Sequence, residues 1–435
     1  MFIKPKTEVY WHTFRKKDSS IKILGENKTA EVIIIGGGMT GLMCADALLK
    51  LGVSVIILEK NFCGGAATGK SSGFITPASE MDLSTLINES GIKEAKRVWG
   101  FITGGTDLIK DAIKKYDLKC DYKEEDSLYI TDTKNDIEEI KQEYESRKIL
   151  GYESSLYEDR ESITKIIGSS KYFSALRYGG TFSINAYSFC EYMKKSLVER
   201  GVEIYENSPV AKINSGSVEV ENFRVSGSKI IFCGDRFVPE LGGLKDEVYH
   251  AQVFTVVSKS LSDADVLKIF PNGHMMVWDT GLVYKYFRIT KDNRLLIGGD
   301  DIFYIYSKKE KMYPLRFINS VLKYFKLKFP EVNLEIEYVW PGLMGISKDF
   351  LPVISEDKKL KNVYYVGGTS GLPWAAALGN YMVDKMIHGR SDFDSYFSSD
   401  RKFPVNSVLQ KLIGKKLVFA LSHAIFHGVF KKFVP

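Results

Sequence analysis

The chain has 435 residues, of which 44% are hydrophobic and 26% are charged. This composition excludes an intrinsically disordered chain, and the length predicts two or three domains with a large buried core. The formal net charge of +6 comes from residues 401–435, which carry seven Lys or Arg residues and no acidic residue. Because the rest of the chain is close to neutral, we expect no nucleic-acid-binding body.

The cysteine pattern argues against disulfides and against a metal site. The five cysteines are scattered, with no CxxC pair, at Cys44, Cys63, Cys120, Cys190 and Cys233. Reduced thiols favour a cytoplasmic protein, and the N-terminus lacks the apolar core of a signal peptide. Of the two apolar stretches, 362–383 is broken by glycine and proline, and 417–430 is shorter than the roughly 20 residues of a membrane span.

The strongest local pattern is a strand, a glycine-rich turn, a helix and a second strand. A β-branched run at 32–35 predicts a buried parallel strand, and the turn follows at 36–41. Apolar residues at helical spacing predict a helix that stops at Gly52, and the apolar strand at 53–58 ends at Glu59. This order is the dinucleotide-binding fingerprint G-x-G-x-x-G followed by an acid.

Each residue of the fingerprint has a physical role. Gly36 permits the tight turn, Gly38 lets the backbone approach a pyrophosphate, and Gly41 lets the helix pack closely on the strand. The helix N-terminus offers free N–H groups to the phosphates. Glu59 can accept hydrogen bonds from a ribose, which favours FAD or NAD over NADP. The long loop of small residues at 64–73 then favours FAD, because it lets backbone approach a flat ring.

The remaining elements follow in chain order with weaker patterns. Helices are expected at 92–113, 135–149 and 187–200, and strands at 127–131, 202–205, 229–233, 275–279, 284–289 and 295–298. A second strand–turn–helix unit follows, with a strand at 363–366, a glycine-rich turn at 367–373 and a helix from Trp374 to about His388. Its spacing does not fit a second dinucleotide site. Its helix N-terminus could hold negative charge on a reduced flavin.

Four segments together resemble the D-amino acid oxidase superfamily of FAD-dependent amine oxidoreductases. They are GGGMTGLMCADALLKLGVSVIILEK, GGAATGKSSGFITP, VWPGLMGISKDFLPVI and VYYVGGTSGLPWAAALGNYMV. Two further segments, 179–210 and 286–301, agree with the same family, and the resemblance covers roughly residues 7 to 400. The chain is most similar to the gamma-glutamylputrescine oxidase-like branch, which has a comparable N-terminal lead-in.

The resemblance implies an α/β fold with two domains. The Rossmann-like FAD-binding domain would be assembled from residues 1–83, 186–237 and 341–400. A second, α+β substrate domain on a mainly antiparallel sheet would come from residues 84–185 and 238–340. Residues 401–435 would form a basic, amphipathic C-terminal segment.

The resemblance also implies the cofactor site. The residues expected to hold FAD are Gly36, Gly38, Met39, Thr40, Gly41, Glu59, Lys60, Thr68, Gly69, Lys70, Ser71, Val210, Gly342, Gly368, Thr369, Ser370, Gly371 and Leu372. We expect non-covalent FAD, because no cysteine follows Cys233 and no histidine lies in the loop at 64–73 where relatives attach the ring.

The implied reaction is oxidation of a small primary or secondary amine to an imine by hydride transfer to flavin N5, with O2 or a quinone as the electron acceptor. Met344 stands where many amino acid oxidases of the family have a carboxylate-binding arginine, which favours an amine over an amino acid. The candidate catalytic residues are Tyr286, Arg288 and Lys348. Arg288 either replaces the missing arginine, or forms a structural ion pair or is an exposed strand residue. Lys348 either acts near the flavin or is an exposed loop residue. His250 and His274 are expected to be ordinary polar residues.

Other functions stay open at this point. The chain could be an amino acid oxidase or dehydrogenase, or a flavin-binding module without turnover. Residues 401–435 could dock the enzyme on an anionic membrane or on RNA, which would give a peripheral membrane location. The competing interpretation is a C-terminal helix that packs on the FAD-binding domain with its lysines in solvent.

Overall fold

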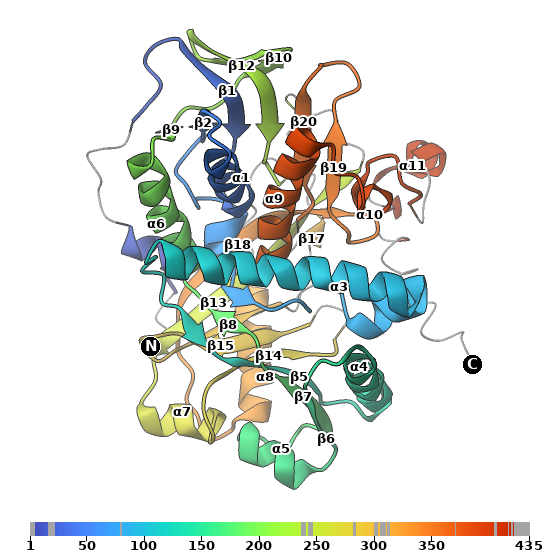
Figure 1. The fold of residues 1–435 in the computed structure, drawn as a ribbon. Coiled ribbons are helices and arrows are strands. Elements are labelled where there is room, and N and C mark those ends of the chain that lie inside the picture. The colour runs from blue at the N-terminus through green and yellow to red at the C-terminus, as the bar shows by residue number, and fades with distance from the viewer. Residues whose placement is uncertain are drawn as a thin grey trace.

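In the computed structural model, two large β-sheets and a set of helices are arranged around a long central helix (Figure 1). The structure describes residues 5–15, 22–78, 81–235, 241, 247–281, 284–299, 303–304, 310, 314–369, 371–403, 407–415, 417–418 and 421. All five cysteines are buried, and none forms a disulfide.

The first sheet is mostly parallel and carries the glycine-rich turn. Its eight strands are β1 (Lys28–Ile35), β2 (Val55–Leu58), β9 (Glu203–Tyr205), β10 (Lys212–Asn214), β11 (Ser217–Val220), β12 (Phe223–Phe232), β19 (Val353–Glu356) and β20 (Val363–Gly367). They run in the order β10-β11-β12-β1-β2-β9, with β20 beside β12 and β19 beside β20. The β-branched side chains Ile33 and Ile34 are fully buried, because β1 is covered on both faces as a central parallel strand.

The second sheet is mainly antiparallel. Its nine strands are β5 (Asp126–Thr131), β6 (Ser155–Tyr157), β7 (Ser174–Tyr178), β13 (Val248–Ser260), β14 (Met275–Asp279), β15 (Tyr286–Ile289), β16 (Arg294–Gly298), β17 (Phe303–Tyr304) and β18 (Ile336–Ser347). The order is β17-β13-β16-β15-β14-β5-β7-β6, with β18 on β13. The exception to antiparallel pairing is β14 beside β5, which pair in parallel. A small third sheet joins β3 (Phe74–Ile75), β8 (Phe182–Ser183) and β4 (Lys123–Glu124).

The helices cover the sheets and fill the space between them. They are α1 (Met39–Lys50), α2 (Ala67–Lys70), α3 (Leu83–Lys115), α4 (Ile137–Leu150), α5 (Arg160–Ile166), α6 (Ala186–Glu199), α7 (Asp263–Ile269), α8 (Pro314–Lys328), α9 (Leu372–His388), α10 (Asp394–Phe397) and α11 (Ser407–Ile413), with short 3₁₀ helices η1 (Tyr10–Phe14) and η2 (Lys134–Asp136). Figure 1 shows α3 crossing the molecule between the two sheets. A glycine permits its close approach to α9, since a Cβ on Gly105 would lie 2.0 Å from the carbonyl oxygen of Pro373.

The observed architecture confirms the predicted fold class, an α/β fold with a mainly antiparallel second sheet. The expected helix at 92–113 is the greater part of α3, which bends at Gly91 (φ 77°). The expected strand at 284–289 begins two residues later, at Tyr286. The predicted domain boundary after residue 340 falls inside β18, which pairs with β13 as far as Ser347. The division of the chain into domains stays a prediction.

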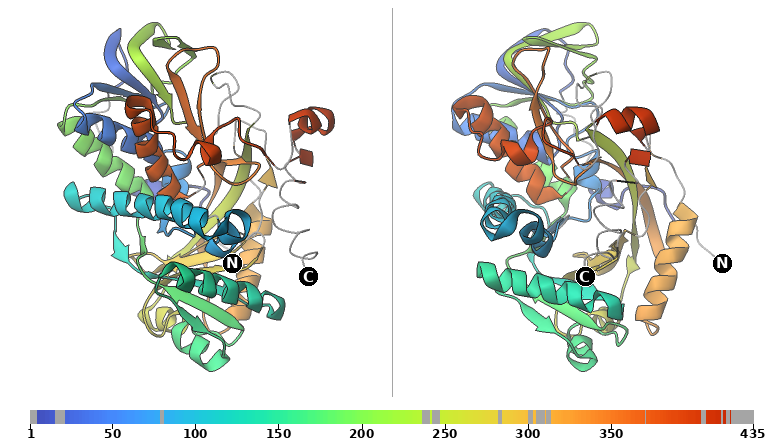
Figure 2. Two further views of the ribbon diagram at one scale, coloured as in Figure 1. Left: turned by 45° about the vertical axis from the view of Figure 1, so that its right-hand side comes forward. Right: turned by 90° about the vertical axis from the view of Figure 1, so that its right-hand side faces the viewer.

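The described helices include none that is long and apolar enough to cross a membrane. The described residues also contain no group of three or more potential metal ligands from His, Cys, Asp and Glu. The two views of Figure 2 place α11 on the outside of the molecule.

Candidate functional site

A cavity of about 890 Å³ lies where the carboxyl ends of the parallel strands face the second sheet. Its volume is in the upper part of the ~300–1,000 Å³ range of ligand and cofactor pockets. Most of the predicted FAD residues line it, namely Gly36, Gly38, Met39, Thr40, Glu59, Lys60, Thr68, Lys70, Ser71, Val210, Gly342, Thr369, Gly371 and Leu372. The predicted residues that do not line the cavity are Gly41, Gly69 and Gly368, and Ser370 lies outside the described residues.

The glycine-rich turn forms a backbone cradle at the start of α1. Gly36 has a φ of 112°, a conformation that favours glycine. Gly41 does not touch the cavity, but a Cβ there would lie 2.0 Å from the carbonyl oxygen of Gly36, so only glycine lets α1 start so close to β1. Gly38 caps α1 without a side-chain hydrogen bond. The first-turn N–H groups of the helix are therefore suited to a pyrophosphate, which fits FAD.

Glu59 stands at the end of β2, beside this turn. Its side chain accepts hydrogen bonds from the N–H groups of Gly37 (2.8 Å) and Asn61 (2.9 Å). Burial raises the pKa of this carboxyl, and the two hydrogen bonds oppose that rise. Glu59 therefore braces the turn as well as lining the cavity, a structural role that the motif alone did not indicate.

The loop of small residues is packed against the same turn. The N–H of Gly64 donates to the carbonyl of Gly37 (3.0 Å), and the Thr68 hydroxyl accepts from the N–H of Met39 (3.1 Å). A Cβ on Gly69 would lie 1.9 Å from the carbonyl oxygen of Gly64, which explains a glycine that does not reach the cavity. The loop is thus placed directly against the expected pyrophosphate site.

A second helix N-terminus faces the cavity at α9. Gly371, with a φ of 91°, caps this helix. Asp235, which the sequence analysis missed, lines the cavity at the same place. Its carboxylate accepts from the N–H groups of Gly345 (2.5 Å) and Thr369 (3.1 Å), and its backbone carbonyl accepts from the N–H of Gly368 (3.3 Å). Asp235 therefore connects β18 to the turn before α9. Its two partners lie 110 and 134 positions further along the chain, so no local sequence pattern could have shown these contacts.

The three candidate catalytic residues have different environments. Tyr286 lines the cavity, and so does Met344. Arg288 is 3% exposed and does not line the cavity, because its guanidinium donates to the carbonyls of Ser72 (2.8 Å) and Ile184 (2.9 Å). Arg288 is therefore not an exposed strand residue, and the hydrogen bonds described for it go to backbone carbonyls and not to a carboxylate.

Lys348 differs from expectation in its burial, whereas nothing in the structure contradicts the expectation for the two histidines. Lys348 is also 3% exposed, with its ammonium 5.0 Å from the ring centre of Phe403, so the interpretation as an exposed loop residue is wrong. It does not line the cavity. His250 lines the cavity, whereas His274 lies outside it beside Lys123.

The wall contributed by the second sheet and its neighbouring helices is acidic and aromatic. Its carboxylates are Asp82, Asp136, Glu139 and Asp279, and its aromatic residues are Tyr129, Trp278, Tyr284 and Tyr286. The lysines among the described lining residues, Lys60 and Lys70, both belong to the segments expected to bind FAD, and no arginine lines the cavity in this part of the chain.

Hydroxyl and backbone N–H groups donate to these carboxylates. The Tyr129 hydroxyl contacts Glu139 and lies 3.5 Å from Asp82, and the Thr280 hydroxyl donates to Asp136 (2.8 Å). Burial raises the pKa of Asp279 to about 6, although backbone N–H groups donate to it and the positive charge of Lys285 opposes the rise. Clustered carboxylates of this kind are most stable with a cation among them.

Comparison with known proteins agrees with the geometry. The family model of FAD dependent oxidoreductases, DAO, matches residues 31–385. The probable oxidoreductase OrdL of Haemophilus influenzae is 27% identical over 372 residues, which cover 83% of this chain and 83% of the relative. Gamma-glutamylputrescine oxidoreductase of Escherichia coli is 25% identical over 403 residues, which cover 90% of this chain and 91% of the relative.

Among solved structures, glycine oxidase from Geobacillus kaustophilus has the same fold, with a TM-score of 0.73 at 17% identity over 87% of this chain and 100% of that chain. The backbone cradle at the start of α1, the small-residue loop and the second helix N-terminus all fit FAD. The chain therefore belongs to the DAO family of FAD dependent oxidoreductases, with distant homology to OrdL and to gamma-glutamylputrescine oxidoreductase.

Proposed function

We propose that this FAD-dependent oxidoreductase oxidises a small primary or secondary amine to an imine, and that FAD is bound non-covalently. When bound, FAD accepts a hydride equivalent from the carbon next to the amine nitrogen. The chain's own residues would hold the amine, exclude water and set its protonation state. The observation that carries the proposal is the acidic wall of the cavity, formed by Asp82, Asp136, Glu139 and Asp279.

Electrostatics favours a cation at this wall. A carboxylate-bearing substrate would be repelled by four acidic groups, and Met344 offers no guanidinium to pair with it. The reacting nitrogen must lose its proton before hydride removal, whereas the wall favours a protonated nitrogen. A diamine meets both conditions, because its distal ammonium can sit at the wall while its other nitrogen reacts. The aromatic side chains Trp278 and Tyr284 would contact the carbon chain between them.

Amino acid oxidation is the second candidate. One similar structure is a glycine oxidase by name, and that name is the observation in its favour. The acidic wall and Met344 oppose it. The relative named for gamma-glutamylputrescine is consistent with an amine substrate.

Non-covalent attachment is supported by the cysteine that lines the cavity. Cys233 follows β12, and its hydrogen bond with Cys44 and its burial raise the pKa of the thiol well above the ordinary value. A protonated thiol is a poor nucleophile. Acid precipitation of the yellow protein is expected to leave a colourless pellet and a yellow supernatant.

The exposed side chains of the C-terminal segment suggest where the enzyme could meet its electron acceptor. In α11 and the residues after it, Leu412 is 76% exposed and Leu417 is 51% exposed, whereas Gln410 and Val418 face the body. The exposed leucines lie among the lysines of residues 401–435. We propose peripheral contact with an anionic membrane, which would suit a membrane quinone as the acceptor, with O2 as the alternative.

The decisive experiment is anaerobic addition of amines to the purified yellow protein. The panel contains putrescine and other diamines, gamma-glutamyl amines, sarcosine, glycine, proline and D-amino acids. We expect diamines to bleach the flavin absorbance, and readmission of air shows whether O2 is the acceptor. Bleaching by amino acids but by no amine would refute the amine proposal and support the second candidate.

A further inference from the structure

Three successive carbonyl groups of the small-residue loop are each held by a side chain from a different part of the chain. The indole N–H of Trp340, from β18, donates to the carbonyl of Lys70 (3.0 Å). The indole N–H of Trp11, from η1, donates to the carbonyl of Ser71 (2.8 Å). Arg288, from β15, donates to the carbonyl of Ser72 (2.8 Å). None of these three donors lines the cavity, so they hold the loop from behind.

This arrangement sets the direction of the loop's N–H groups. The described chain contains no cis peptide bond, and a planar trans peptide directs its C=O and its N–H to opposite sides. The carbonyls of Ser71 and Ser72 point at Trp11 and Arg288, so the N–H groups of Ser72 and Gly73 point the opposite way. Ser72 and Gly73 both line the cavity. The loop thus presents two backbone donors on its cavity side.

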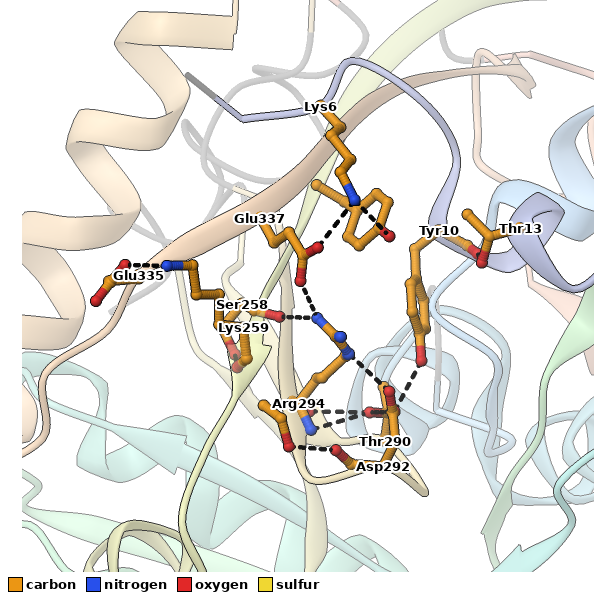
Figure 3. Close-up of polar contacts among 12 residues, drawn as sticks. Lys6, Tyr10, Thr13, Ser258, Lys259, Thr290, Asp292, Arg294, Glu335 and Glu337 are labelled. Carbon is orange, nitrogen blue, oxygen red and sulfur yellow. Dashed lines mark hydrogen bonds and ion pairs between the residues drawn. The ribbon is translucent and has the colours of Figure 1, made fainter. Parts of the chain in front are cut away.

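Trp11 belongs to residues 5–15, here called the N-terminal strap, which lies outside the family match of residues 31–385. The strap is fastened to the second sheet at two points. Lys6 pairs with β18 in a parallel bridge, since its N–H donates to the carbonyl of Glu337 (2.8 Å), and its side chain pairs with the same residue's carboxylate (3.0 Å). The Tyr10 hydroxyl donates to Asp292 (2.7 Å), and Arg294 bridges Asp292 and Glu337 (Figure 3).

The burial of two strap side chains indicates that the strap is held in a fixed position. Tyr10 is 3% exposed and Trp11 is 2% exposed, although both come from a short segment near the N-terminus. The guanidinium of Arg288 lies 5.4 Å from the ring centre of Trp11, so two of the three loop donors also contact each other.

We propose that the N-terminal strap is a cofactor-positioning element, in which Trp11 acts as a positioning residue for FAD by fixing the backbone of Ser71 and Ser72. The N–H groups of Ser72 and Gly73 would then face the bound cofactor across the cavity, and donors on that side would stabilise the negative charge that reduction places on it. Loss of the Trp11 hydrogen bond lets the Ser71–Ser72 peptide rotate, which weakens FAD binding and lowers its midpoint potential. The inference rests on FAD binding and not on the identity of the amine.

The test is Trp11→Phe, which keeps an aromatic ring against Arg288 but removes the indole N–H. The apoprotein is titrated with FAD, and binding is followed by quenching of flavin fluorescence. We expect the dissociation constant to rise about five- to tenfold, the usual effect of losing one hydrogen bond. The midpoint potential of the reloaded protein is expected to fall. Trp340→Phe is expected to act in the same direction.

The matched control is Thr13→Ala, on the same strap. Within the part of the chain that the structure describes, the Thr13 hydroxyl donates only to the carbonyl of Tyr10 in its own turn (2.7 Å), so FAD affinity and potential are expected to stay at the wild-type values. A Trp11→Phe variant that melts at a lower temperature but keeps the wild-type affinity and potential would show a purely structural role and overturn the proposal.

A second variant removes a hydrogen bond that fastens the strap to the second sheet. Tyr10→Phe removes the hydroxyl that donates to Asp292 and leaves the loop untouched. It is expected to raise the FAD dissociation constant relative to Thr13→Ala, by less than Trp11→Phe does. Equal FAD affinity in Tyr10→Phe and Thr13→Ala would contradict the proposal even if Trp11→Phe did not fold.

Discussion

His12 is expected to stay neutral well below the pH at which histidines ordinarily become protonated. Its ring lies edge-on to Phe62 (5.1 Å between ring centres) and to Tyr187 (5.3 Å). Burial lowers its pKa to about 4, and repulsion from the nearby cations Lys70 and Arg15 contributes to the same shift. Its Nε2 atom is buried and has no hydrogen-bond partner among the described residues.

This shift makes the folded state less stable in acid. The unfolded chain binds a proton at this histidine below pH 6.5, whereas the folded chain does so only near pH 4. Stability is therefore complete above about pH 6.5 and is lost as the pH falls from there toward 4. At pH 5 the pKa difference corresponds to a loss of about 2 kcal/mol, from about 1.5 pH units at about 1.4 kcal/mol per unit.

The assay combines a variant with a direct titration. His12→Phe keeps the edge-on packing and removes the ionisable group, so the free energy of unfolding is expected to fall by about 2 kcal/mol less between pH 7 and 5 than in the wild type. In protein labelled with ¹³C-histidine, the chain's six histidines give separate signals, and the signal missing in His12→Phe identifies His12. We expect that signal not to shift down to pH 5. A titration midpoint above pH 6, or parallel stability curves for the two proteins, would refute the reasoning.

Three further predictions concern the cradle, the acidic wall and the C-terminal segment. Gly41→Ala places a Cβ 2.0 Å from the Gly36 carbonyl oxygen, so it is expected to destabilise the fold by about 3 kcal/mol and to abolish FAD binding. The control is Gly100→Ala, which has open space around it and is expected to stabilise α3 by roughly 0.5–1 kcal/mol. Urea unfolding and FAD titration compare the two variants. Met344→Arg is expected to lower kcat/KM for a diamine at least roughly tenfold by adding a cation at the cavity, which steady-state kinetics measures, and an unchanged value would contradict a cationic substrate. In a flotation assay, full-length protein is expected to float with vesicles that contain phosphatidylglycerol and to remain in the bottom fraction with neutral vesicles. A chain that ends at Phe403 is expected to remain in the bottom fraction with both kinds of vesicle. Identical behaviour of the two chains would contradict the proposed membrane contact.

The fold class and most of the cofactor site could be predicted from the sequence because their signals are local. The turn at 36–41 and Glu59 lie within one strand–helix–strand unit, where each residue's role depends on neighbours a few positions away. The resemblance to the DAO family added Val210, Gly342 and the turn before α9, and the structure brings Val210, Gly342 and, from that turn, Thr369 and Gly371 to the same cavity. The absence of an arginine at Met344 was also readable without coordinates.

The remaining features depend on contacts between distant segments, which a local pattern does not encode. Arg288 and Lys348 look alike in sequence as isolated cations, yet both are buried outside the cavity, one bonded to loop carbonyls and the other packed on an aromatic ring. The acidic wall is likewise assembled from separate elements, since Asp82 precedes α3, Glu139 lies in α4 and Asp279 ends β14.

The sequence by itself indicated a dinucleotide cofactor, because a phosphate-binding turn needs only a glycine spacing and the strand and helix that flank it, and the small-residue loop with the family resemblance indicated FAD. Only the tertiary structure decided what surrounds that cofactor. Trp11 and Ser71 are 60 residues apart, and Asp235 and Thr369 are 134 apart. Hydrogen bonds across such separations depend on how the sheets pack, because their geometry is set by the relative placement of whole elements and not by the residues next to them in the chain.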